Sequence, residues 1–141
     1  MIVYLDTSAL VKLVFQEPGS DLAAELWDRA ELLVSSQLVY PEARAALAAA
    51  RRADRIDEPA HALAVEAFEE IYAELRILGI DEPLARHAGD LAARHALRGY
   101  DAVHLASALA IEAKDVLLAT WDTALGDAAY ETGALLVNDI A

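Results

Sequence analysis

The sequence of 141 residues contains no cysteine, which excludes a disulfide framework, a thiolate metal site and a cysteine nucleophile. This absence suits a reducing compartment such as the cytosol. No hydrophobic run is long enough to span a membrane, because His104, Glu112 and Lys114 interrupt the most apolar late segment. The N-terminus has no basic region, and Asp6 and Lys12 break its apolar stretch, so no signal peptide is predicted. We therefore expect a cytoplasmic protein that does not contact membranes.

Basic residues are also scarce. Eleven Lys and Arg residues stand against 24 Asp and Glu residues, which gives a formal net charge of −13. Such a charge repels nucleic acid unless metal ions or local basic residues intervene, and it favours a basic protein partner. Hydrophobic residues make up 57% of the chain, above the usual half. This excess suggests that some apolar surface is buried against another chain.

Short apolar runs alternate with helical patterns along the whole chain. Apolar runs typical of buried strands lie at residues 2–5, 32–34, 116–119 and 134–137. Apolar spacing and breaker residues predict helices at about residues 6–16, 21–30, 36–52, 59–78, 81–95, 101–113 and 123–132. Gly79 is the expected stop of the fourth helix, and Ile80 is a candidate for a very short strand. The alternation predicts one α/β domain over residues 1–141, a three-layer α/β/α fold with a short, mostly parallel central sheet.

Two acidic residues follow predicted strands closely. Asp6 comes directly after the run 2–5, and Asp122 follows the run 116–119 after two residues. Equivalent ends of parallel strands lie on the same edge of a sheet, which is where open α/β sheets build their sites. The alternative interpretation is that each Asp only caps the helix that follows it.

Two further acidic residues belong to the same regions of the predicted fold. Asp101 starts the helix that leads into the third strand, and it could also serve as a cap. Glu42 lies beside the apolar stripe of its helix, where a charged residue is less expected, although it could pair with Arg44 or reach solvent. We expect both carboxylates at the sheet edge that carries Asp6.

Four converging carboxylates need a compensating charge. Two unit charges about 4 Å apart repel by about 4 kcal/mol at an effective dielectric near 20. Either some of the acids keep their protons or a cation binds between them. Oxygen ligands without Cys or paired His select Mg²⁺ or Mn²⁺. Such a site can activate water and neutralise charge on a phosphodiester, which predicts phosphodiester hydrolysis.

Four segments of the sequence resemble the PIN domain family. Asp6-Thr7-Ser8 after an apolar strand resembles the opening of that domain. The segment 36–42, which leads from a serine into a helix with Glu42, resembles its second acidic motif. Residues 101–108 and Thr120-Trp121-Asp122 are similar to its third and fourth motifs. These motifs keep their order along the chain, and the small single domain is similar to VapC-type toxins of toxin–antitoxin pairs.

This resemblance implies a Mg²⁺- or Mn²⁺-dependent endoribonuclease that forms a homodimer and is inhibited by a cognate antitoxin. The positions that match the family's catalytic and metal-binding acidic quartet are Asp6, Glu42, Asp101 and Asp122. Asp6 and Asp101 are the expected direct metal ligands. The small polar positions that could support the site are Thr7, Ser8 and Thr120. The charge of −13 favours a restricted RNA substrate, or local basic contacts, over broad RNA affinity.

Several other residues allow two interpretations. His104 lies one helical turn after Asp101, where it could donate a hydrogen bond to the site or simply be a packed or surface histidine. Trp121 could stack on a base or pack beside the strand. The only concentration of basic residues, which could hold RNA phosphates or form a solvated helix face, comprises Arg44, Arg51, Arg52 and Arg55.

Two other classes of protein were weighed against the nuclease. An Asp-based phosphatase of the haloacid dehalogenase type places a second Asp two residues after the first, where this chain has Ser8. A response-regulator receiver needs an acidic pair by the first strand and a late Lys, yet no Lys follows Lys114. A PIN-like scaffold that only binds a partner remains as the non-catalytic alternative.

Overall fold

The computed structural model describes residues 1–137. The elements in chain order are β1 (Ile2–Leu5), α1 (Thr7–Val14), α2 (Ser20–Arg29), β2 (Leu32–Ser36), α3 (Val39–Arg52), α4 (Glu58–Glu74), β3 (Arg76–Leu78), α5 (Glu82–His95), α6 (Gly99–Leu109), β4 (Val116–Ala119), α7 (Thr123–Glu131) and β5 (Leu135–Leu136). None of the helices within residues 1–137 has both the length and the apolar character that crossing a membrane requires.

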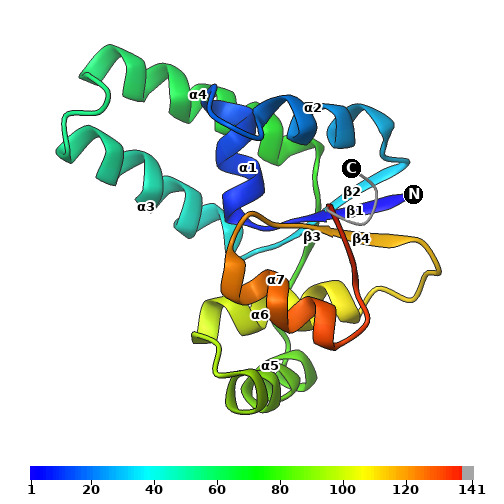
Figure 1. The fold of residues 1–141 in the computed structure, drawn as a ribbon. Coiled ribbons are helices and arrows are strands. Elements are labelled where there is room, and N and C mark those ends of the chain that lie inside the picture. The colour runs from blue at the N-terminus through cyan, green and yellow to red at the C-terminus, as the bar shows by residue number, and fades with distance from the viewer. Residues whose placement is uncertain (138–141) are drawn as a thin grey trace.

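The five strands form one sheet in the order β3-β2-β1-β4-β5, and every neighbouring pair is parallel. All strands therefore end at the same edge, on the left in Figure 1. Helices α1 to α4 lie above the sheet in that view, and α5, α6 and α7 lie below it. The predicted three-layer α/β/α fold is confirmed, and the sheet is wholly parallel within the described residues.

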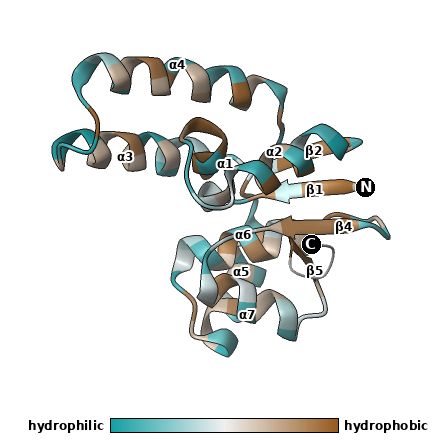
Figure 2. Cartoon of the chain, turned by 45° about the horizontal axis from the view of Figure 1, so that its top comes forward, coloured by the Kyte–Doolittle hydropathy of each residue, from teal (hydrophilic) through white to brown (hydrophobic). Residues whose placement is uncertain are grey.

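Alternate residues of β1 enter two separate cores. Val3 and Leu5 are fully buried against the layer of α1 to α4, where Phe68 of α4 is also fully buried. Tyr4 points to the opposite layer and packs with Leu105 of α6. The brown colour of β1 and β4 in Figure 2 marks their hydrophobic character, which is expected of strands covered on both faces. The central strand thus presents its carboxyl end, and Asp6, from between two packed layers.

The predicted helix over residues 59–78 is wrong in its last turn. α4 ends at Glu74, Leu75 adopts an extended backbone, and Arg76–Leu78 form the edge strand β3, which pairs with β2. The apolar spacing of Leu75 fits a continued helix, but β2 offers a row of backbone partners that only an extended segment can use. Gly79 therefore follows a strand instead of stopping a helix, and Ile80 is outside the sheet.

Other predicted boundaries shift by a few residues, and three shifts affect α3 and α6, the helices that carry Glu42 and Asp101. Ser36 ends β2, and α3 begins only at Val39. α6 starts at Gly99 with Arg98 as its N-cap, so Asp101 lies inside the first turn and is not the cap. α6 also ends at Leu109 instead of near residue 113. The shifted starts of α3 and α6 leave Glu42 and Asp101 in the first turns of their helices, close to the carboxyl edge of the sheet.

Candidate active site

Asp6 lies at the carboxyl end of β1 and is 3% exposed. Its Oδ1 accepts hydrogen bonds from the Ala9 backbone N–H at 2.9 Å and the Ser8 hydroxyl at 2.7 Å. Its Oδ2 accepts a bond from the Thr120 hydroxyl at 2.6 Å. Burial raises the pKa of Asp6, and the bonds from Thr120, Ser8 and Ala9 oppose that rise. Asp6 therefore caps α1 and also forms the buried floor of the site.

Glu42 reaches the same region from the first turn of α3. Its Oε1 accepts a hydrogen bond from the Thr7 hydroxyl at 3.0 Å and lies 2.6 Å from His104 Nε2. No partner of its other oxygen, Oε2, is found within residues 1–137. One carboxylate oxygen is therefore anchored, and the other can serve a ligand or a water.

His104 is buried, at 2% exposure, and connects Glu42 to the interior. Its Nδ1 lies 2.8 Å from the hydroxyl of Tyr4, which is itself fully buried. All three groups are satisfied when the Tyr4 O–H donates to Nδ1 and Nε2–H donates to Glu42, which describes a neutral imidazole. Burial raises the pKa of Tyr4, which keeps its hydroxyl a donor. The structure thus makes His104 a packed residue and a hydrogen-bond partner of the site at once.

Asp101 and Asp122 both accept hydrogen bonds from the guanidinium of Arg98. Asp101, in the first turn of α6, accepts a hydrogen bond at Oδ2 from Arg98 Nε at 2.9 Å. Arg98 Nη2 lies 3.3 Å from Oδ2 of Asp122, beyond the end of β4. Asp122 also caps α7, because its Oδ1 accepts a bond from the Leu125 N–H at 2.9 Å. The arginine thus joins two acidic residues that belong to different elements.

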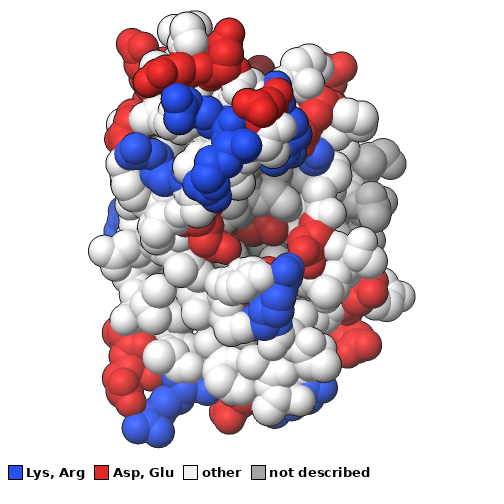
Figure 3. All heavy atoms as spheres, turned by 90° about the vertical axis from the view of Figure 1, so that its left-hand side faces the viewer, with Lys and Arg blue, Asp and Glu red and all other residues white. Residues whose placement is uncertain are grey.

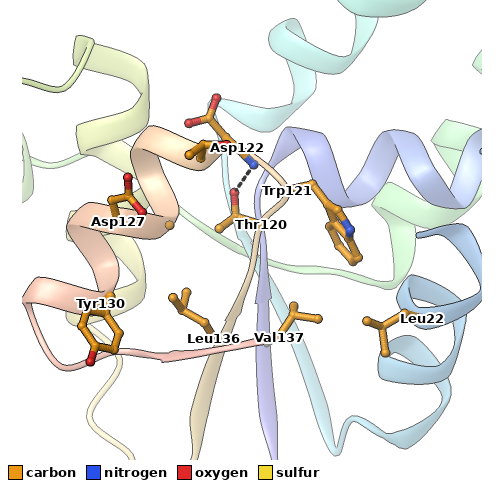
Figure 4. A pocket seen from close by; sticks show the side chains of 10 residues that line it. Leu22, Thr120, Trp121, Asp122, Asp127, Tyr130, Leu136 and Val137 are labelled. Atoms are coloured by element: carbon orange, nitrogen blue, oxygen red, sulfur yellow. Dashed lines mark hydrogen bonds between the residues drawn. The ribbon is translucent and has the colours of Figure 1, made fainter. Parts of the chain in front are cut away.

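Thr120 and Ser8 join the two strand ends that carry Asp6 and Asp122. Besides bonding Asp6, the Thr120 hydroxyl accepts a bond from the Asp122 backbone N–H at 3.1 Å, drawn in Figure 4. The Ser8 hydroxyl accepts a bond from the Trp121 N–H at 2.9 Å and lies 3.5 Å from the Thr120 hydroxyl. Figure 3 shows acidic side chains around a hollow on the side of the molecule at which the strands end.

The donor set of this edge fits a hard divalent cation. Four carboxylates and three hydroxyls contribute oxygen, and the chain has no thiol, which is the chemistry that Mg²⁺ and Mn²⁺ prefer. Each carboxylate is at present paired with protein donors. Among residues 1–137, no three His, Asp or Glu side chains form a group that could hold a metal ion in this arrangement. The assignment of Asp6, Glu42, Asp101 and Asp122 as ligands therefore stays a prediction.

A cavity of about 480 Å³ adjoins Asp122 on the side of α7 and α2. Figure 4 shows Trp121 and Leu22 on one side of it, with Tyr130 and Asp127 on the other. Trp121 is partly buried against the core in the layer of α1 to α4, and the ammonium of Lys12 lies 5.4 Å from the centre of its ring. Trp121 is thus a packed aromatic that also lines a hollow next to the site.

The arginines of α3 and of the loop that follows it divide into paired and unpaired groups. Arg44 contacts Glu69 and the Tyr40 hydroxyl, and Arg51 forms an ion pair with Glu58 at 3.2 Å. Arg52 and Arg55 are exposed, and neither has an ion-pair partner among residues 1–137. Figure 3 shows basic side chains gathered above the acidic hollow, where the α3–α4 hairpin projects past the strand ends. Whether they touch RNA stays a prediction.

Sequence reasoning missed two residues of the site. The first is Arg98, although its spacing of three residues from Asp101 is a signal for an ion pair near a helix start. The second is Tyr4, which belongs to the predicted strand 2–5, and its contact with His104 spans 100 positions of sequence, for which no local signal exists.

The sequence matches a known protein family and curated relatives over most of its length. The profile of the PIN domain family matches residues 3–130. Ribonuclease VapC45 of Mycobacterium tuberculosis is 47% identical over 132 residues, covering 94% of this chain and 92% of the relative. Ribonuclease VapC46 of that species is 32% identical, covering 96% and 95%.

Solved structures share the fold. PAE2754 from Pyrobaculum aerophilum superposes with a TM-score of 0.72 at 25% identity, covering 99% of this chain and 86% of that one. FitAcB from Neisseria gonorrhoeae gives a TM-score of 0.71 at 23% identity, covering 96% of each chain. With the family profile spanning nearly the whole sequence, this chain belongs to the PIN domain family.

Proposed function

We propose that this protein is a divalent-metal-dependent endoribonuclease and the VapC-type toxin of a toxin–antitoxin pair. The observation that carries the proposal is one edge of the sheet at which Thr120 and Arg98 join Asp6, Asp122 and Asp101. At the same edge, Thr7 and His104 hold Glu42. Family membership and relatives that are named ribonucleases support the choice of an RNA phosphodiester as substrate.

Four carboxylates would hold the metal, which we propose to be Mg²⁺, with Mn²⁺ able to replace it. Asp6 supplies buried oxygens beneath the site, Asp101 and Asp122 supply oxygens from the α6 and β4 sides, and Glu42 offers Oε2. When bound, the ion neutralises charge on the scissile phosphodiester and lowers the pKa of water. Thr7 and His104 hold Glu42 in place, and Glu42 Oε2 then orients the attacking water.

The proposed regulatory partner is a cognate antitoxin. Structures with the same fold include a toxin–antitoxin complex from Klebsiella pneumoniae and VapBC2 from Rickettsia felis. The net charge of −13 favours an antitoxin with a basic docking face. A homodimer in the cytoplasm completes the proposal, in keeping with the apolar excess of the chain.

Substitution Asp101→Asn tests the nuclease directly. With Mg²⁺ or Mn²⁺ and a mixed cellular RNA pool, we expect the wild-type protein to cut RNA and the variant to lose about 10²- to 10³-fold of the rate, because one charged group of the site is gone. The matched control is Asp90→Asn, an exposed residue of α5, which should cut normally. Cleavage is followed on sequencing gels, with a chelator as a further control.

Three outcomes separate the competing functions. Equal cleavage by wild type and Asp101→Asn would point to a contaminating nuclease and contradict the proposal. The non-catalytic scaffold would be favoured if none of the proteins cuts RNA and if their complexes with the antitoxin contain no RNA. Growth arrest on expression that Asp101→Asn relieves and Asp90→Asn does not would support the toxin assignment specifically.

The unpaired arginines of the α3–α4 hairpin give a prediction for RNA binding. Replacing Arg52 and Arg55 by Gln should weaken RNA binding about 3- to 10-fold and reduce the slope of log K against log salt by about 1.4, the value for two lost contacts to single strands. Fluorescence anisotropy measures the affinity for RNA and its salt dependence, and a chelator in the buffer prevents cleavage during the measurement. A double variant at Arg29 and Arg86, each paired within its own helix, is the charge-matched control. Equal losses in the two double variants would assign the effect to net charge.

A further inference from the structure

Arg98 is the only basic side chain that the described structure places on two of the four acidic residues of the site. Its Nε bonds Oδ2 of Asp101 and its Nη2 lies 3.3 Å from Oδ2 of Asp122. These carboxylates come from the first turn of α6 and from the segment after β4, which are separate in the chain. The guanidinium fork therefore holds them together in the absence of a metal ion.

The Arg98 side chain reaches the two carboxylates from the solvent side. The Arg98 side chain is 59% exposed, whereas the Asp101 side chain is 8% exposed and that of Asp122 is 29% exposed. The guanidinium also lies 4.6 Å from the ring centre of Tyr100, which is 41% exposed. The guanidinium therefore contacts the aromatic face of Tyr100 while it bridges the two carboxylates. Arg98 can therefore leave the carboxylates without unpacking any buried element.

We propose that Arg98 is the resident counter-ion of the active site and that a divalent metal ion must displace it from Asp101 and Asp122. The inference rests on the proposed metal-dependent function. Oδ1 of Asp122 already accepts the Leu125 N–H, so a metal ion at this carboxylate competes with Arg98 for Oδ2. A divalent ion bound beside Asp101 and Asp122 is also repelled by a guanidinium that stays between them. Arg98 thus preorganises the acidic pair while it lowers the affinity of the site for metal.

Metal binding measured by calorimetry tests the competition. Arg98→Gln should bind Mn²⁺ about 5- to 10-fold more tightly than the wild-type protein, since a charge-assisted hydrogen bond no longer has to be broken. Arg86→Gln removes the same charge from exposed α5 and should change the dissociation constant less than about twofold, the scale of a screened surface charge. Equal or weaker binding by Arg98→Gln would overturn the inference.

NMR of the arginine side chain separates displacement from a simple charge effect. In the metal-free protein the Arg98 Nε–H is bonded to Asp101, and its resonance should be distinct from those of solvated arginines. Saturation with diamagnetic Mg²⁺ should move this resonance to the solvated position, while the Arg86 resonance stays unchanged. An Arg98 resonance that does not move at saturation would overturn displacement, even if calorimetry shows a difference.

The two proposals fail in different ways. If none of the three proteins binds Mn²⁺ or Mg²⁺, the metal-dependent nuclease is refuted, and the competition that rests on it is refuted as well. If all three bind metal with the same affinity and cut RNA, only the role of Arg98 is refuted. Tighter metal binding by Arg98→Gln, with no RNA cleavage by any of the three proteins, would uphold the competition and contradict the nuclease.

Discussion

Asp6→Asn is expected to abolish RNA cleavage and, at the same time, to raise the melting temperature of the metal-free protein at neutral pH. Asn preserves the oxygen that caps α1, and its amide can donate to the Thr120 hydroxyl in place of accepting from it. Asn removes a buried negative charge, which the fold disfavours. Activity should fall by about 10²- to 10³-fold, as for other lost charges of a site.

The gain in stability has a defined pH dependence. The pKa of Asp6 is raised above its ordinary value of 3.8 in the folded protein, so the fold favours the protonated acid. Its contribution to stability is fully present below pH 3.8 and is lost as the pH rises through the folded pKa. The advantage of Asn should therefore be absent in acid and largest at neutral pH, where we expect about 2–4 °C, equivalent to about 1 kcal/mol in a chain of this size.

Differential scanning calorimetry with a chelator, at several pH values, checks this expectation. Adding Mg²⁺ should raise the melting temperature of the wild-type protein through binding and leave that of Asp6→Asn almost unchanged. The difference in melting temperature between the two proteins should therefore become smaller or change sign. The matched control is Asp90→Asn, whose carboxylate is exposed. A lower melting temperature for Asp6→Asn at neutral pH without metal would contradict the assigned effect of burial.

Substitutions at His104 should separate the positioning of Glu42 from the stability of the core. His104→Gln places an amide N–H near the former Nε2 and can keep the bond to Glu42, whereas His104→Asn is shorter and keeps only the side toward Tyr4. Both variants leave one buried partner unsatisfied and should lose about 1–3 kcal/mol of unfolding free energy. Only His104→Asn should lose about 10- to 100-fold in kcat, the usual cost of removing a partner that orients a ligand of a metal.

The measurements are melting temperatures together with kcat and KM for a defined RNA. Tyr4→Phe serves as the control, because it removes the hydroxyl on the interior side of His104 and leaves the bond to Glu42 in place. It should lower stability without a large change in kcat. Similar kcat values for His104→Gln and His104→Asn would show that His104 contributes only to packing.

The sequence predicted the parts of the site that depend on local order. Asp6 follows a short apolar run, and such a run, buried on both faces of a parallel sheet, places the next residue at the carboxyl edge. Asp122 followed from the same argument. Both residues also cap helices, as the alternative interpretation expects, and their role as metal ligands stays a prediction.

The parts that could not be predicted depend on distant partners. The helical spacing of Phe68, Ile71 and Leu75 continues formally into residues 76–78, but the edge of β2 draws those residues into the sheet. Arg98 was missed because its contact with Asp122 depends on how α6 packs beside β4, 24 positions later in the chain. Periodicity reports the face of an element and says little about which charged groups meet at its end.

The pairing of β1 with β4 at the centre of the sheet also sets when the protein can become active during its synthesis. Asp6 is made almost first, yet the hydroxyl that binds its Oδ2 belongs to Thr120, 114 residues later. Asp122, the second carboxylate held by Arg98, follows still later. A nascent or prematurely ended chain therefore carries Asp6 and Glu42 without the other half of the site. With the proposed site residues, the order of the strands is expected to delay RNA cleavage until nearly the whole chain has been translated and folded.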